Sequence, residues 1–246
     1  MNLFINQEKT KHMPVAKKNH DSYPHYLAVG PYKSQAFHIF SYLGSDVNCN
    51  NDISAQIQKR ILGANRCFHG LRKHLRSHLT SKDTKILMYK VLIRPVLTYA
   101  SETWTLSKTN ERRLSLFERK VLRCIFGGKQ ENGTWRKRYN YELYETFNET
   151  NIVTYIKVNK LAWTGHLVRM NNDRTLKMIF NTKSDGVRNV GKKKKFGRLK
   201  LQWEDGVDQD IRILGIENWK KVALKRDEWA KLLKKARAHQ GLSSQR

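Results

Sequence analysis

The sequence has little that could build a membrane span, a disulfide framework or a proline-rich linker. No apolar run approaches the roughly 20 residues that cross a bilayer. Polar residues interrupt the first thirteen positions, where a signal peptide would be continuously apolar. The three cysteines, Cys49, Cys67 and Cys124, lie far apart, which favours reduced thiols in an intracellular protein. Only four prolines are present, so the chain has few strong breaks.

Acidic residues are scarce as well. The 246 residues include 21 Asp plus Glu against 48 Lys plus Arg, which gives a formal net charge of +27. Such an excess of positive charge favours a polyanionic partner. We therefore expect the chain to bind RNA, DNA or an RNA–DNA hybrid in the nucleus or in a cytoplasmic ribonucleoprotein. We expect no membrane, small-molecule substrate or cofactor among its ligands.

Three amphipathic helices are predicted in the first half of the chain. An apolar stripe runs with steps of three and four from Ile53 to Leu75, opposite basic residues. A second helix follows Thr80 or Ser81, with Ile86, Leu87, Val91 and Leu92 expected on its inner face and Pro95 expected to kink or end it near Arg94. Ser107 begins a third, which carries Leu114, Phe117, Val121 and Ile125 and ends at Gly127-Gly128.

The second half is also predicted to be helical. One helix covers 152–170, although Gly165 lies inside it, and two more carry Trp203 to Leu214 and Trp219 to Leu233. Phe37 to Leu43 suit a strand or hairpin. The predicted fold is thus mainly α, a helical bundle and a C-terminal helical region with a short β-hairpin near the N-terminus.

The segment 183–200 differs in kind, with eight basic residues, one acid and three glycines. Too little apolar surface is available to order it, so we expect a mobile basic loop. Its run Lys192–Lys195 fits a nuclear import signal, a phosphate-binding arm or an ordinary solvated loop. These three readings stay open.

Several segments resemble the reverse transcriptase of insect-type non-LTR retrotransposons. They are FSYLGS (40–45), IRPVLTYASETWTL (93–106), FERKVLRCIFG (117–127), WTGHLVRM (163–170), QWEDGVDQDIRILGI (202–216) and ARAHQGL (236–242). Their order and spacing match the family over nearly the whole chain. One departure is Gly197-Arg198-Leu199, where the family has glycine-arginine-proline.

The resemblance implies that the chain is the C-terminal part of such an enzyme. Residues 1–48 would then be a palm remnant with a hairpin that positions the primer end, 49–128 a thumb-like three-helix region, and 129–246 a basic helical region beyond the thumb. The family's metal-binding aspartates would lie before Met1, so we expect no catalytic residues and no nucleotide transfer by this chain alone. The alternatives are a domesticated nucleic-acid-binding adaptor, a relic without function, or a truncated gene model of an intact enzyme.

The expected interface consists of basic residues that contact phosphates and of one exposed tryptophan that stacks on bases. Its candidate residues are Lys59, Arg60, Arg66, Arg72, Lys73, Arg76, Trp135, Arg136, Arg138, Lys192, Lys193, Lys194, Lys195 and Arg198. By resemblance, Phe40, Tyr42, Leu43 and Gly44 form the primer-positioning hairpin.

Two constellations could suggest a metal site. Cys67, His69, His74 and His78 lack the paired short spacings of structural zinc sites. Asp205, Asp208 and Asp210 place only the first two on one helix face. We therefore expect no metal site. Trp163, Trp203, Trp219 and Trp229 fall on apolar stripes, where core packing is expected rather than base stacking.

Overall fold

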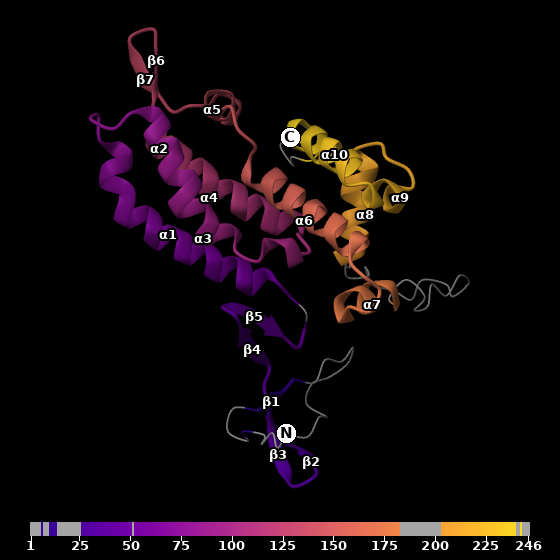
Figure 1. Cartoon of the computed structure of the whole chain (residues 1–246). Coiled ribbons are helices and arrows are strands. Elements are labelled where there is room, and N and C mark those ends of the chain that lie inside the picture. Colours follow the sequence, from indigo (N-terminus) through magenta and orange to yellow (C-terminus); the bar gives the residue numbers. More distant parts are fainter. Residues whose placement is uncertain are drawn as a thin grey trace, which may run out of the picture. The chain divides into compact units, whose positions relative to one another are not determined.

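The computed structural model describes residues 6, 10–13, 26–50, 52–182, 203–239 and 242. The chain divides into two compact units, Met1–Arg60 and Ile61–Arg246. Helices dominate, which confirms the mainly α fold predicted from the apolar stripes (Figure 1). Within the described residues, no helix is both long enough and apolar enough to cross a membrane.

The first unit contains two small sheets rather than the single hairpin expected. Strands β2 (Tyr26–Val29) and β3 (Tyr32–Ala36) pair antiparallel, and β1 (Lys11–His12) pairs parallel with β3. Strands β4 (Ile39–Tyr42) and β5 (Ser45–Asn48) form a separate antiparallel hairpin. The tight turns at Gly30 and Gly44, both with positive φ, allow these short reversals.

Helix α1 (Ser54–Arg76) follows the predicted stripe closely. Asp52 accepts a hydrogen bond from the backbone N of Ser54 at 2.9 Å and so satisfies one of the free donors at the helix start. The stripe is buried at Ile57, Ile61, Ala64, Phe68 and Leu75. The 3.6-residue period of the apolar residues therefore identified both the helix and its buried face.

The second predicted helix was placed correctly, but its inner face was wrong. Helix α2 (Lys82–Met88) begins after Ser81, whose Oγ accepts from the backbone N of Thr84. A π-helical turn (Tyr89–Ile93) and α3 (Arg94–Thr98) continue it. The residues expected inside include Leu87, Val91 and Leu92, which are 58%, 58% and 44% exposed, whereas the buried ones are Lys85, Tyr89, Ile93 and Leu97.

Pro95 explains this shift of the buried face. Proline has no N–H to donate to the carbonyl four residues earlier, and its ring crowds that carbonyl. In the turn before it, the N–H of Arg94 donates instead to Tyr89, five residues back. A wider turn keeps residues spaced by four on one face, so the buried row advances in steps of four. Regular α-helical geometry is thus interrupted from Met88 on, earlier than the kink or end expected near Arg94, and it resumes in α3, which contains Pro95.

Helix α4 (Lys108–Phe126) has the predicted cap, stripe and end. Ser107 caps it, the four expected apolar residues are buried, and Gly127 ends it with φ +67°. On the same helix Glu118 is fully buried and accepts hydrogen bonds from the Tyr89 hydroxyl (2.8 Å), the Tyr144 hydroxyl (3.0 Å) and the backbone N of Ile152 (3.0 Å). Burial raises the pKa of this carboxyl, and the three donors oppose that rise.

A hairpin that the sequence did not predict follows α4. It pairs β6 (Lys129–Glu131) with β7 (Thr134–Arg136) through an Asn132-Gly133 turn in which both residues have positive φ. An Asn-Gly pair with this geometry is typical of a type I′ turn. Helix α5 (Asn140–Phe147) comes next. The polar stretch after Gly128 thus forms an ordered projection from the helical unit (Figure 1).

The remaining helices pack around α6 (Ile152–Arg169), which contacts α4, α8 and α10. They are α7 (Thr175–Thr182), α8 (Trp203–Ile213), α9 (Trp219–Leu224) and α10 (Arg226–Ala238). Trp219 and Trp229 are buried in this core, as expected. Gly165 lies directly against Trp229, whose indole N–H donates to the carbonyl of Leu161 at 3.1 Å.

Candidate nucleic-acid interface

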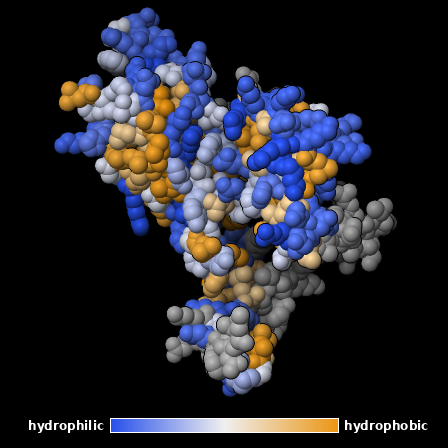
Figure 2. All heavy atoms as spheres, in the orientation of Figure 1, coloured by the Kyte–Doolittle hydropathy of each residue, from blue (hydrophilic) through white to orange (hydrophobic). Residues whose placement is uncertain are grey.

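The outer face of α1 within the second unit carries four of the predicted phosphate contacts. Arg66, Arg72, Lys73 and Arg76 are all exposed. Within the described part of the chain, the side chains of these four residues make no ion pair with an acid and no hydrogen bond. Hydrophilic residues cover most of the visible surface of this unit, with smaller apolar patches between them (Figure 2). These side chains therefore keep their charge available for an external anion.

Cations from two helices converge near the last turn of α4. Burial raises the pKa of the Cys124 thiol, and the positive charges of Arg76, Arg72 and Lys85 act against that rise. The three positive charges therefore act on one and the same sulfur atom. Among the described residues none of the three is paired with an acid. We call Arg72, Arg76 and Lys85 the α1–α2 cation cluster.

Lys85 was missed from the sequence because it lies on the face that packs inward. Its side chain is only 7% exposed, so its aliphatic part is buried. A lysine at such a position extends its stem over apolar neighbours and keeps its ammonium near the surface. The apolar pattern of α2 predicted a leucine or isoleucine face here. The only sequence signal would have been the step of four from Lys85 to Tyr89, Ile93 and Leu97.

Lys59 and Arg60 differ from the other four cations of α1 because both have bonding partners within the protein. In the first unit, Lys59 Nζ pairs with Asp46 at 2.7 Å and Arg60 Nη2 donates to the carbonyl of Gly44 at 2.7 Å. Gln56 Oε1 accepts from the backbone N of Asp46 at 3.0 Å. The Lys59 ammonium holds the pKa of Asp46 below its usual value. Both cations attach the β4–β5 hairpin to α1, so a phosphate would have to compete with these bonds.

The hairpin compared with a primer-positioning element has an exposed apolar tip. Phe40 is 38% exposed, Tyr42 62% and Leu43 73%. Leu43 and Gly44 form the turn with φ +48° and +76°. A leucine in the left-handed region costs about 1–2 kcal/mol. The bonds from Gln56, Lys59 and Arg60 fix the hairpin in spite of this strain.

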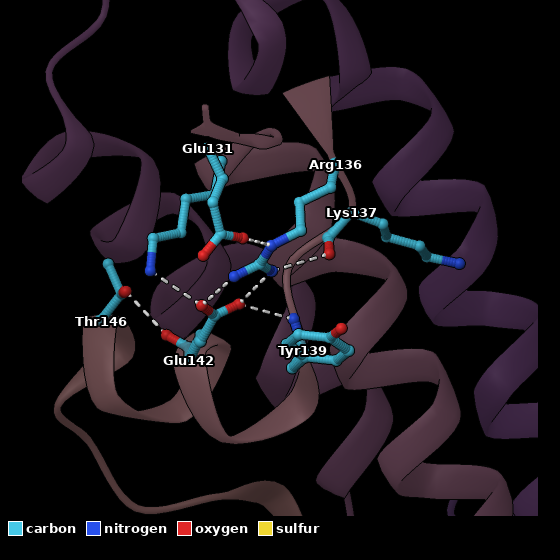
Figure 3. Close-up of polar contacts among 7 residues, drawn as sticks. Glu131, Arg136, Lys137, Tyr139, Glu142 and Thr146 are labelled. Carbon is cyan, nitrogen blue, oxygen red and sulfur yellow. Dashed lines mark hydrogen bonds and ion pairs between the residues drawn. The ribbon is translucent and has the colours of Figure 1, made fainter. Parts of the chain in front are cut away.

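The β6–β7 hairpin holds Trp135 and Arg136 in unlike environments. Trp135 lies in β7 and is 74% exposed. Arg136 bonds to both oxygens of Glu142, at 2.8 and 2.9 Å, and also pairs with Glu131 (Figure 3). Glu142 is 5% exposed and also accepts from Lys129 and from the backbone N of Tyr139. These donors, Arg136 first, hold the pKa of Glu142 far below its usual range.

Arg136 is thus fixed by acids instead of facing solvent as a free cation. Arg138 is partly buried, while Lys137 beside it is exposed. Among the predicted residues of this segment, Trp135 is therefore the side chain most open to a ligand. The remaining candidates, Lys192 to Lys195 and Arg198, and the loop 183–200 in which they occur, lie outside the described residues.

The carboxylates considered for a metal site have structural partners. Asp208 accepts from the indole N–H of Trp219 at 2.9 Å, and Asp210 pairs with Lys160 at 2.7 Å. In the described ranges, no three His, Cys, Asp or Glu side chains come together as a metal site would need. The adjacent acid pairs Glu204-Asp205 and Asp227-Glu228 lie in the first turns of α8 and α10, where their negative charge interacts favourably with the positive end of the helix dipole.

Comparison with known proteins gives one informative match. The chain is 23% identical over 201 residues to a Caenorhabditis elegans protein described as uncharacterized and transposon-derived. The matched region covers 80% of this chain and 70% of that protein. No protein-family model matches the chain. No solved structure matches it either. The likeness suggests an origin in a transposable element.

Proposed function

We propose that this chain derives from the C-terminal part of a non-LTR retrotransposon reverse transcriptase and binds RNA, DNA or their hybrid through phosphates, without transferring nucleotides by itself. The motifs at 40–45, 93–106, 117–127 and 202–216 support the origin. The similarity to a transposon-derived protein agrees with it. Nucleic-acid binding rests on the charge and on the exposed cations of α1.

The observation that carries the binding proposal is the α1–α2 cation cluster. The positive charges of Arg72, Arg76 and Lys85 act on the same thiol, so an anion bound beside the two exposed arginines would be attracted by all three. Guanidinium groups match phosphate oxygens in geometry as well as in charge. Lys73 and Arg66 extend the same charged face of α1. A helix of this kind can lie along a phosphate backbone and hold position without reading sequence.

The test measures how binding depends on salt. The purified chain is titrated into labelled DNA duplex and RNA–DNA hybrid at several salt concentrations, and log K is plotted against log salt. Each phosphate contact on duplex DNA contributes about −0.9 to the slope. Arg72→Gln combined with Arg76→Gln should therefore flatten the slope by roughly two units. It should weaken binding to unrelated sequences about equally.

A matched control removes the same charge elsewhere. Lys231 and Lys235 are exposed and spaced by four on α10, as Arg72 and Arg76 are on α1. Changing both lysines to Gln should leave the slope nearly unchanged. Equal effects of the two double variants would refute a localised interface and leave only the overall charge. Salt-insensitive binding, or strong discrimination between duplexes of equal length, would favour a sequence-reading adaptor.

A further inference from the structure

We propose that Tyr139 and Tyr141 form a stacking platform for unpaired bases of a single-stranded nucleic acid, and that the exposed Trp135, which precedes them in β7, offers a further ring. This inference deepens the proposed function and depends on it. It adds a second site, at the β6–β7 hairpin and the start of α5, with a ligand form different from the duplex expected at the α1–α2 cation cluster. The two tyrosines were not among the residues singled out from the sequence.

Exposed aromatic rings are the first observation. Trp135, Tyr139 and Tyr141 are 74%, 57% and 67% exposed. Tyr139 and Tyr141 are stacked, with ring centroids 5.9 Å apart and planes inclined by only 10°. Large rings are normally buried when they serve the core, and here three open rings occur within seven residues. Tyr141, stacked against Tyr139 and 67% exposed, can accept a planar partner on its other side.

The second observation is that these rings are held in place. The guanidinium carbon of Arg136 lies 4.6 Å from the centroid of the Tyr139 ring. Arg136 is itself immobilised by Glu142 and Glu131 (Figure 3). Trp135 packs on Gly128, where an added Cβ would lie 3.2 Å from its ring atom Cε3. Binding a base would therefore cost little ordering of the side chains that receive it.

Charge is the third observation, and it favours an anionic ligand such as nucleic acid over a neutral or basic peptide surface. Between Gly128 and Glu142 there are four cations and two acids. Both acids are engaged by Arg136 or Lys129, so neither confronts a phosphate alone. Lys137, in the same segment of the chain, is exposed. Aromatic faces flanked by positive charge are the usual means of holding single strands without reading sequence.

Duplex is excluded from the platform by the stacking itself. Bases within a duplex already stack on their neighbours and do not offer a free face, whereas those of a single strand do. The two sites should thus respond differently to substitution. Replacing a platform ring should weaken single-strand binding and spare duplex binding.

The experiment uses the full chain and two probes, a labelled oligothymidylate of about 15 nucleotides, near the upper site size of single-strand modules, and a duplex of the same length. Tyr141→Ala should weaken oligothymidylate binding by about 5- to 150-fold, the range measured for one stacked base. Duplex affinity should change by less than about twofold. Tyr141→Phe is the matched control: it keeps the ring and loses the hydroxyl, and it should bind oligothymidylate like the unchanged chain.

Salt dependence separates stacking from charge. Stacking releases no counterions, so Tyr141→Ala should displace the line of log K against log salt without changing its slope. Unchanged single-strand affinity in Tyr141→Ala, equal loss for duplex, or a Phe variant as weak as the Ala variant would each overturn the platform. If the unchanged chain binds neither probe, the proposed function fails as well. If it binds both and only the platform substitution is silent, the proposed function stands.

Discussion

Gly165→Ala should destabilise the protein more than any ordinary surface change. The Cβ added at Gly165 would lie 2.1 Å from Trp229 Nε1, 2.5 Å from Cδ1 and 2.8 Å from Cε2. Nonbonded heavy atoms normally keep about 3.5–4.0 Å apart. Trp229 is 2% exposed, is hydrogen-bonded to Leu161 and packs on Trp219. The indole therefore cannot move aside without breaking those contacts.

The magnitude follows from three contributions. Overpacking a core costs about 1–3 kcal/mol. Displacing the indole leaves its buried N–H without the Leu161 carbonyl, which costs about another 1–3 kcal/mol. Alanine favours a helix over glycine by about 1 kcal/mol. The net expectation for Gly165→Ala is a loss of about 1–5 kcal/mol.

Denaturant unfolding at constant slope measures this loss. Gly70→Ala is the matched control, since Gly70 lies inside α1 with open space where its Cβ would be. That variant should gain about 0.5–1 kcal/mol, the ordinary helix preference. If Gly165→Ala is as stable as Gly70→Ala, α6 and α10 do not approach each other as closely as described.

Three further predictions concern the core, the stability at acidic pH and catalysis. Ile61→Ala should cost about 2–5 kcal/mol in the free energy of unfolding because Ile61 is buried, whereas Leu62→Ala, at an exposed neighbour, should stay within about 0.5 kcal/mol; similar midpoints for both would contradict the assigned face. Glu142 has its pKa lowered in the folded state, mainly by Arg136, so its contribution to stability is present above the unfolded pKa of about 4.3 and declines as pH falls below it. Glu142→Gln should accordingly lower the free energy of unfolding at pH 7 and have little effect on it in acid. Glu145→Gln should leave the free energy of unfolding unchanged at both pH values. Purified chain should not extend a primer on an RNA template with Mg²⁺ or Mn²⁺, because no two adjacent acids occur on an apolar strand to hold metal ions; template-dependent products would overturn this expectation.

Local patterns predicted the helices well. The stripes from Ile53 to Leu75 and from Leu114 to Ile125 located α1 and α4 and their buried faces. Ser81 and Ser107 proved to be the caps that begin α2 and α4. Such signals depend on residues within one or two turns, so they can be read without knowing the rest of the fold.

Contacts between distant residues were beyond local patterns. Gly165 looked like a weakness in its helix, and the structure shows that it makes room for Trp229, 64 positions later. Lys157 and Lys160 pair with Glu111 and Asp210, at 2.8 and 2.7 Å, and connect α6 with α4 and α8. Breaking one partner of such a buried pair is strongly destabilising.

For the candidate site, too, some features could be read from the sequence and others depend on tertiary contacts. Composition and spacing alone determined that the chain is basic, mainly helical and charged along the outer face of α1, because charge and period are properties of the sequence itself. Only the tertiary structure decided which cations have partners. It pairs Arg136 with Glu142, bonds Arg60 to Gly44, gathers Arg72, Arg76 and Lys85 near Cys124, and stacks Tyr139 on Tyr141. Whether a charge is available to a ligand depends on neighbours brought together by folding, and their distance along the chain does not reveal them.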